Sequence, residues 1–102
     1  MLIDYHNRAI KEIRDIREYI SYDSSLIAVK FINKLLDYIS YLSLFPELGR
    51  LVLSEYHIRK LVYQNYIILY QINYLSHSIQ ILTIFHSKKD INLILKNIQK
   101  FL

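Results

Sequence analysis

The chain has 102 residues, of which 53% are hydrophobic and 22% charged, and its single glycine and single proline exclude a disordered or linker-rich protein. The length fits one domain, residues 1–102, and the absence of cysteine excludes disulfides and thiolate metal sites. The net charge of +4 comes from the second half, because residues 1–55 hold seven Lys/Arg and eight Asp/Glu whereas residues 56–102 hold six and one, which predicts an acidic partner: RNA, DNA or protein.

Targeting segments, membrane spans and cofactor sites are not expected. Asp4, His6 and Arg8 precede any apolar run, so the start of the chain lacks the pattern of a signal peptide. No uninterrupted apolar stretch approaches the roughly 18 residues of a membrane span. The chain also contains no glycine-rich phosphate loop, carboxylate pair or metal-ligand cluster. We therefore expect a cytoplasmic protein with no cofactor, no metal site and no membrane partner.

The first half of the chain predicts a short strand followed by two helices. Residues 2–6 alternate enough for an edge strand, and helical periodicity then runs from about Asn7, the expected N-cap, to residue 20. Residues 23–25 are expected to cap a second helix over residues 26–44. Because so few residues join the two helices, we expect them to form an antiparallel hairpin. The hairpin ends at Phe-Pro-Glu-Leu-Gly-Arg, residues 45–50, where we expect Gly49 to adopt a positive φ.

The second half predicts three strands and a helix. Residues 57–63, 66–74 and 79–85 are rich in Ile, Val, Leu, Tyr and Phe, and their short links predict an antiparallel meander. With the N-terminal strand, the predicted fold class is α+β: an antiparallel four-stranded sheet, in the order strand-helix-helix-strand-strand-strand, with the N-terminal helical hairpin on one face and a C-terminal helix. That amphipathic helix is predicted over residues 89–102, with Asp90 or Ser87 as its cap. Because the last two strands are apolar on nearly both faces, the second face of the sheet must be covered or used.

An ordered set of residues across most of the chain carries a resemblance to a known group of proteins, and the turn Phe45-Pro46-Glu47-Leu48-Gly49-Arg50 is its most specific part. The other members are Ala9, Ile13, Ile16, Tyr19 and Ile20; Ala28, Phe31 and Leu35; Ile58-Arg59-Lys60-Leu61; Tyr66-Ile67-Ile68-Leu69-Tyr70; and Ile81-Leu82-Thr83-Ile84-Phe85-His86. In these residues the chain resembles the RelE/ParE superfamily, the toxins of bacterial type II toxin-antitoxin systems, and it looks more like ParE than RelE. The resemblance implies a concave sheet face opposite the hairpin and a cognate antitoxin protein that wraps and silences the toxin in a hetero-oligomer.

The resemblance also implies one of two activities. ParE-like members inhibit DNA gyrase without covalent chemistry, whereas RelE-like members, the mRNA interferases, cut mRNA on the ribosome. RelE-like nucleases typically carry Arg directly after the first Tyr of the third strand and a Tyr near the C-terminus, but here Ile67 follows Tyr66 and no tyrosine follows Tyr74. We therefore expect growth inhibition through DNA gyrase. A ribosome-dependent mRNA endonuclease is the alternative, a non-toxic antitoxin-binding relative is the second, and whether the chain is an enzyme stays open.

The candidate site residues are cations and a histidine near the expected strand ends, together with the apolar stripe of the C-terminal helix. In a nuclease, His86 would transfer protons while Arg59 and Lys88 bind phosphate, and the alternative for His86 and Arg59 is a structural role. The residues expected to contact gyrase, or the ribosome and mRNA, are Arg50, Arg59, Lys60, His86, Lys88 and Lys89. Those expected to bind the antitoxin, or a second toxin, from a partly buried helix are Ile91, Ile94, Ile98 and Phe101.

Two further expectations concern side chains away from these sites. Tyr19, Tyr38, Tyr66 and Tyr70 occupy apolar positions at helix or strand spacing, so we expect them in the core rather than stacked on nucleic acid. On the first helix, we expect ion pairs between Lys11 and Asp15 and between Arg14 and Glu18.

Overall fold

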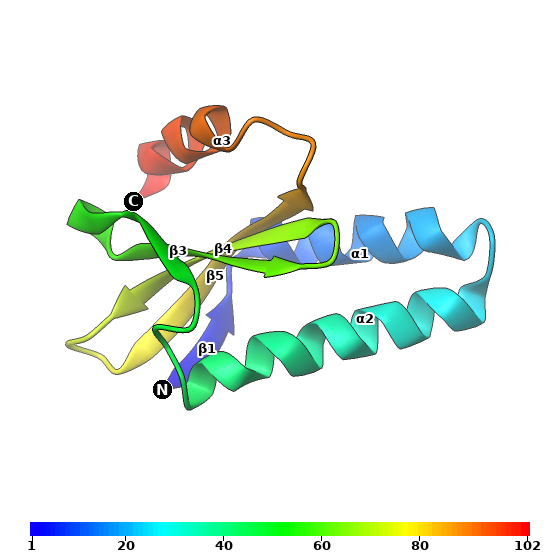
Figure 1. Cartoon of the computed structure of the whole chain (residues 1–102), viewed down its shortest axis with the longest axis horizontal. Helices are drawn as coiled ribbons and strands as arrows, with labels where there is room; N and C mark the ends of the chain where they lie inside the picture. Colours follow the sequence, from blue (N-terminus) through cyan, green and yellow to red (C-terminus); the bar gives the residue numbers. More distant parts are fainter.

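The fold is a five-stranded mixed sheet between a helical hairpin on one face and a short C-terminal helix on the other (Figure 1). The computed structural model describes residues 1–102, and no helix in it has the length and apolar character needed to cross a membrane. In chain order the elements are β1 (Leu2–Tyr5), α1 (Asn7–Ser21), α2 (Ser25–Ser40), the 3-10 turn η1 (Tyr41–Ser43), β2 (Arg50–Leu53), η2 (Ser54–Tyr56), β3 (Ile58–Tyr63), β4 (Tyr66–Asn73), β5 (Ser78–His86), α3 (Ile91–Ile98) and η3 (Gln99–Phe101).

The sheet has the order β1-β5-β4-β3-β2, so the predicted four-stranded antiparallel sheet is wrong in two respects. The meander of β3, β4 and β5 is antiparallel, as predicted, but β1 pairs with β5 in parallel. The hairpin carries the chain from β1 to the far edge of the sheet, and the meander returns it to β1, so two helices provide the long crossover that parallel pairing requires. The fifth strand, β2, pairs with β3, and because three of its four residues are consecutive apolar residues it gives no period-two signal in the sequence.

Side-chain caps define where the helices begin. His6, rather than the predicted Asn7, caps α1, because its Nδ1 accepts a hydrogen bond of 3.0 Å from the Arg8 backbone N–H. Ser24 caps α2 by accepting a bond of 3.2 Å from the backbone N–H of Ile27. Asp90, one of the two predicted caps, accepts at the start of α3. Each cap satisfies a backbone donor that a first helical turn would otherwise leave open.

The first core lies between the hairpin and the sheet. The strands direct alternate side chains to this face, so Ile68, Tyr70 and Ile72 of β4 all point toward α1 and α2. Their partners from the hairpin include Ala9, Leu35, Ile39 and Leu42, all fully buried. Burial of this apolar surface holds the hairpin against the sheet.

The second core lies between the sheet and α3, and it explains why the strands are apolar on both faces. The intervening residues of β4, Ile67 and Leu69, join Phe85 of β5 and pack against Ile94 and Ile98 of α3. Figure 1 shows α3 lying across the sheet from the hairpin. The face that the resemblance implied to be concave and open is therefore covered, over these residues, by the chain's own C-terminal helix.

Candidate functional site

The turn at residues 45–50 is anchored by one buried tyrosine. The hydroxyl of Tyr70 donates to the carbonyl oxygen of Pro46 at 2.7 Å and accepts from the backbone N–H of Gly49 at 2.9 Å. Gly49 does not have the positive φ that we predicted. It is required because a Cβ atom there would lie 2.7 Å from the Lys60 carbonyl oxygen and 2.8 Å from the Tyr70 ring. Close packing, and not backbone conformation, fixes glycine at this position.

Arg59 belongs to the same anchored turn. Its guanidinium donates to the Gly49 carbonyl oxygen at 2.8 Å and lies 3.9 Å from the Glu47 carboxylate, with 18% of the side chain exposed. Both contacts are within the chain, so Arg59 has a structural role here, but its guanidinium is bound to the turn and does not lie in water as the alternative that we considered had it.

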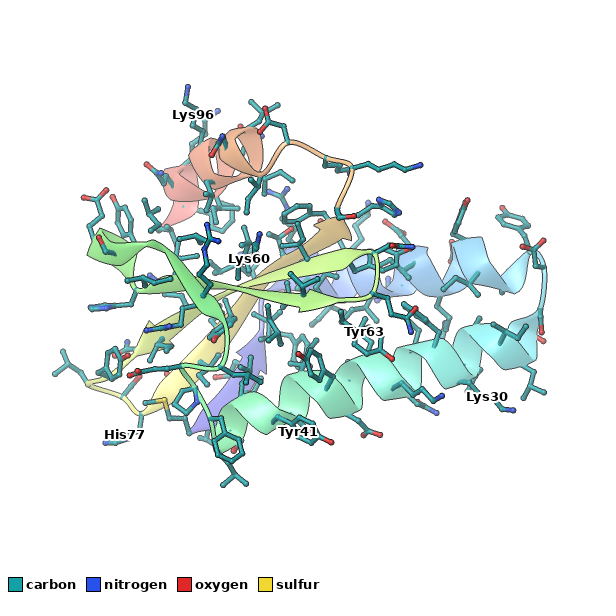
Figure 2. The ribbon with its side chains drawn as sticks, viewed as in Figure 1. Lys30, Tyr41, Lys60, Tyr63, His77 and Lys96 are labelled. Atoms are coloured by element: carbon teal, nitrogen blue, oxygen red, sulfur yellow. The ribbon has the colours of Figure 1, made fainter.

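Arg50 and Lys60 lie on the opposite face of the sheet from Arg59. They pair directly across β2 and β3, and Lys60 also pairs with Leu69, whose side chain packs beneath α3. Figure 2 shows Lys60 on the α3 side of the sheet, and Lys96 projecting from α3 away from it. Neither Arg50 nor Lys60 forms an ion pair within the chain. This face therefore carries two adjacent cations whose charges are free to meet an acidic partner.

His86 ends β5 beside a pocket of about 230 Å³ that α1 helps to form. Its ring meets that of Tyr66 edge to face at 5.5 Å, and its Nδ1 accepts a bond of 3.1 Å from the Lys88 backbone N–H. A neutral His86 therefore carries its proton on Nε2. Burial raises the pKa of Tyr66, and the nearby Tyr19 raises it further. The pocket is lined by Glu12, Asp15, Ile16, Tyr19, Tyr66, Ile84, Phe85, His86 and Lys89.

The predicted catalytic residues do not all converge. In the antiparallel ladders Arg59 is opposite Tyr70, whereas His86 is opposite Tyr66, four residues along β4. At about 3.4 Å per residue the two positions are separated by roughly 14 Å along the strands. Lys88, in contrast, is two residues after His86 in the chain and is exposed. The structure thus brings His86, Lys88 and Lys89 together and keeps Arg59 apart from them.

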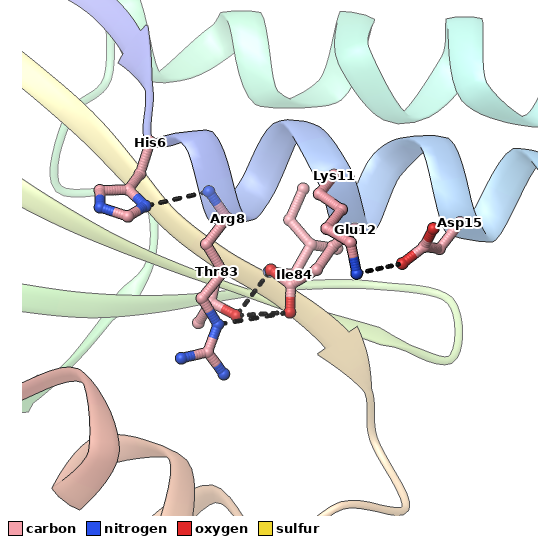
Figure 3. Close-up of polar contacts among 7 residues, drawn as sticks. All are labelled: His6, Arg8, Lys11, Glu12, Asp15, Thr83 and Ile84. Atoms are coloured by element: carbon pink, nitrogen blue, oxygen red, sulfur yellow. Dashed lines mark hydrogen bonds and ion pairs between the residues drawn. The ribbon is translucent and has the colours of Figure 1, made fainter.

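Glu12 holds the end of β5 that carries His86 (Figure 3). Pairing with β1 stops at Ile81, and beyond it the Glu12 carboxylate accepts from the Thr83 hydroxyl at 2.8 Å and from the Ile84 backbone N–H at 3.0 Å. Arg8 lies 3.6 Å from the same carboxylate. In the sequence, Glu12 has the helical spacing of an ordinary surface residue on α1, and no local pattern predicts its contact with β5.

The C-terminal residues expected to bind an antitoxin are unequally exposed. Ile94 and Ile98 are buried against the sheet, and Ile91 is half-buried. Phe101 is 43% exposed, and its ring stacks on that of His6 at 4.9 Å. In this conformation a partner can therefore reach Phe101, the half-buried Ile91 and Leu93, which is 58% exposed.

The outcomes for the tyrosines and helix ion pairs are mixed. Tyr70 is fully buried, and Tyr38 and Tyr66 are half-buried, but Tyr19 is 73% exposed and is not a core residue. Lys11 and Asp15 form the expected pair at 3.7 Å. The predicted pair of Arg14 with Glu18 is not formed. No group of three or more His, Asp or Glu side chains is arranged to hold a metal ion.

Comparison with known families identifies the family of this chain. The family model described as the ParE toxin of the type II toxin-antitoxin system, parDE, matches residues 3–91. The chain belongs to the ParE toxin family. The match reaches from β1 to the first residue of α3, so it includes both the hairpin and all five strands of this ParE-family protein. No curated protein sequence is significantly similar to it.

Solved structures share the fold of this ParE-family chain. One is described as the chromosomal ParDE TA system from P. aeruginosa, with a TM-score of 0.73 and 16% identity over 86% of this chain and 97% of that chain. The intact E. coli RelBE toxin-antitoxin complex gives a TM-score of 0.56 at 16% identity, over 86% and 98% of the two chains. The isolated E. coli RelE toxin gives 0.57 at 16% identity, over 99% and 98%. At this identity the similarity shows the fold alone.

Proposed function

We propose that this ParE-family chain is a toxin that a cognate antitoxin neutralises, and that it inhibits DNA gyrase by binding. The observation that carries the proposal is the separation of Arg59 from His86. Cleavage of RNA requires a base, an acid and phosphate-binding cations around one phosphate. Arg59 is instead held by Gly49 and Glu47, four strand positions away from His86. Inhibition by binding needs no such convergence.

The proposed gyrase contacts are the exposed cations on two parts of the surface. Arg50 and Lys60 lie together on the α3 face of the sheet, and Lys88 and Lys89 follow His86 at the end of β5. Free positive charges on a surface raise the rate and specificity of association with an acidic partner. Arg59 is omitted from the proposed contacts because its guanidinium is already bound within the chain.

A second candidate function, ribosome-dependent mRNA cleavage, is favoured by the pocket beside His86. The imidazole lies in a pocket that also contains the Glu12 and Asp15 carboxylates and the Lys89 side chain. A histidine, a carboxylate and a cation are groups that can move a proton and bind a phosphate. Under this alternative His86 and Lys88 would act without Arg59.

The proposed antitoxin contacts are the apolar residues of the C-terminal segment. Phe101 is exposed and Ile91 half-buried, so both can be reached in this conformation, whereas contact with Ile94 and Ile98 requires α3 to move. An amphipathic segment that supplies apolar side chains to such a stripe is a common mode of protein recognition.

The decisive experiment compares the purified chain in two reactions. With gyrase and plasmid DNA, we expect gyrase-linked DNA breaks to accumulate, and with ribosomes and mRNA we expect no cleavage. The double variant Arg50→Glu/Lys60→Glu should weaken gyrase inhibition about tenfold, because two contact charges are reversed. The matched control Lys30→Glu/Lys34→Glu changes the net charge equally on the outer side of α2 and should leave inhibition unchanged.

Other outcomes select the alternatives. Codon-positioned mRNA cuts that disappear in His86→Ala would replace gyrase inhibition with mRNA cleavage. Growth that is unaffected by induction of the chain, with neither reaction observed, would identify a non-toxic antitoxin-binding relative.

A further inference from the structure

Large apolar side chains are exposed together on the turn that connects the hairpin to β2. Phe45 is 62% exposed and Leu48 is 47% exposed, and the preceding Leu44 is 80% exposed. Residues 45–48 line an open hollow of about 460 Å³ on this surface. We call the surface formed by Leu44, Phe45 and Leu48 the apolar turn. It belongs to neither hydrophobic core, and adjoining exposed apolar side chains of this kind mark sites where a partner binds.

The backbone of the apolar turn is fixed by hydrogen bonds within the chain. The backbone N–H of Phe45 donates to the Tyr41 carbonyl oxygen at 2.9 Å, and that of Leu48 donates to the Phe45 carbonyl oxygen at 3.0 Å. The buried hydroxyl of Tyr70 holds the turn at two further points. A surface that is ordered before it binds loses little conformational entropy on binding, so the apolar turn is preorganised for contact.

The polar groups of the turn are already occupied. The Glu47 carboxylate lies 3.9 Å from the Arg59 guanidinium and accepts a bond of 3.1 Å from the Tyr74 hydroxyl. The Gly49 carbonyl oxygen accepts from Arg59. A partner would therefore bind here through apolar contact. Nucleic acid does not fit, because its phosphates require cations and Glu47 is the one charged residue that lines the hollow.

Arg50 gives the apolar turn a charged edge. It lies two residues after Leu48, so the two Cα atoms are within about 7 Å of each other. Arg50 is exposed and forms no ion pair, and it pairs across β2 and β3 with Lys60, which also forms none. The charge beside the apolar turn is therefore positive, and it is complementary to carboxylates on a partner.

We propose, on the basis of the proposed function, that the apolar turn anchors this chain to DNA gyrase. Phe45 and Leu48 would fill an apolar pocket of the enzyme, and carboxylates at the edge of that pocket would meet Arg50. A few buried aromatic and aliphatic side chains carry most of the binding energy of a typical interface, whereas charges at its rim set rate and specificity.

Two other occupants fit the apolar turn less well. The contacts proposed for the antitoxin are on α3, whereas Arg50 is one of the proposed gyrase contacts and continues directly from the turn. A second copy of this chain, related by two-fold symmetry, would bring Arg50 of both copies together, and like charges would oppose that contact.

The test measures how strongly the full-length chain binds gyrase after exposed apolar side chains are removed. The variant Phe45→Ser/Leu48→Ser should bind immobilised gyrase about tenfold more weakly than the unaltered chain in surface plasmon resonance, and should cause fewer gyrase-linked DNA breaks. The matched control Tyr22→Ser/Leu75→Ser also removes one exposed aromatic residue and one exposed leucine, from the α1–α2 link and the β4–β5 turn, and should bind as the unaltered chain does. Both variants should keep the melting temperature of the unaltered chain, because all four side chains are exposed.

A second measurement locates the contact. Because the chain has no cysteine, a polarity-sensitive dye can be attached at one position only, through Leu44→Cys or Leu75→Cys. When gyrase is added, the emission of the dye at position 44 should shift to shorter wavelength and that of the dye at position 75 should not change.

The outcomes separate this inference from the proposed function. Equal gyrase binding by the two double variants, or a dye shift at position 75 alone, would overturn the anchor and leave gyrase inhibition standing. Self-association of the unaltered chain that is lost in Phe45→Ser/Leu48→Ser would also overturn it, by assigning the apolar turn to a second copy. Failure of the unaltered chain to bind gyrase would overturn the anchor and the proposed function together.

Discussion

The carboxylate of Glu12 on α1 accepts hydrogen bonds from the hydroxyl of Thr83, at 2.8 Å to one oxygen and 2.9 Å to the other, where β5 extends beyond the end of β1. Its first oxygen also accepts from the Ile84 backbone N–H. Beyond the end of β1, the Glu12 side chain of α1 is thus the acceptor for these donors at the edge of β5. His86 lies two residues further along β5, where it pairs with Tyr66 of β4.

Replacing Glu12 should therefore destabilise the protein. In Glu12→Ala the buried Thr83 hydroxyl and the Ile84 N–H lose their acceptor, which should cost about 1–3 kcal/mol of unfolding free energy. Glu12→Gln retains one side-chain oxygen and should cost less. Urea-induced unfolding followed by circular dichroism measures both values. Equal losses for alanine and glutamine would show that the acceptor is not what stabilises this edge.

Gly49→Ala should also destabilise, for a steric reason. The added methyl group would lie 2.7 Å from a backbone oxygen of Lys60, which can move only if β3 moves. We expect a cost of about 1–3 kcal/mol, seen as a lower melting temperature. The clash with backbone would persist in Gly49→Ala/Tyr70→Phe, so removal of the Tyr70 hydroxyl should not rescue the variant. A melting temperature equal to that of the unaltered chain would refute the close packing.

Arg59 and Lys60 are neighbours with different expected roles. Arg59→Ala should lower the unfolding free energy by about 1–2 kcal/mol, because the Gly49 carbonyl oxygen loses the 2.8 Å hydrogen bond that the Arg59 guanidinium donates to it. Lys60→Ala should leave it within about 0.5 kcal/mol, because the Lys60 side chain makes no hydrogen bond or ion pair. Denaturant titrations of the two variants give the comparison. A large loss in Lys60→Ala would contradict its assignment as a free surface cation.

Tyr5 should make stability depend on pH in the alkaline range. Burial raises the pKa of the Tyr5 phenol from 10.0 to about 12 in the folded protein. The unfolded chain therefore loses this proton first, and as pH rises between these two values the unfolded state binds fewer protons than the folded state. Stability is present in full below pH 10.0 and should fall as pH approaches about 12. Thermal unfolding of Tyr5→Phe should show a smaller fall, and an identical pH dependence would exclude Tyr5 as a contributor.

The sequence predicted the local elements of this fold better than their pairing. Periodicity placed both hairpin helices and the β3–β4–β5 meander, because each depends on contacts between residues that are close in the chain. The parallel position of β1 depends on where a crossover of two helices returns the chain, which no local pattern records. The site was harder for the same reason: Glu12 meets Thr83 across 71 positions, and its spacing on α1 matches that of a solvated residue.

The two faces of the sheet show how a correct pattern can leave a functional question open. In β4 and β5 apolar residues occupy both alternating sets of positions, so the second face of the sheet had to be covered or used. This pattern does not identify what covers that face. The cover proved to be α3, whose stripe we had expected to be partly free for an antitoxin. Intramolecular and intermolecular partners bury the same kind of residue, so only the three-dimensional structure separates the two.

Variants in α3 should show whether this helix stays on the sheet in solution. Ile98 is fully buried between α3 and the sheet, so Ile98→Ala removes core packing and should cost about 2–5 kcal/mol of unfolding free energy. Leu93, on the same helix, is 58% exposed, and Leu93→Ala should cost less than about 0.5 kcal/mol. Chemical unfolding of the isolated chain measures both. If the two variants are equally stable, α3 is not docked on its own sheet, and Ile94 and Ile98 are free to bind a partner.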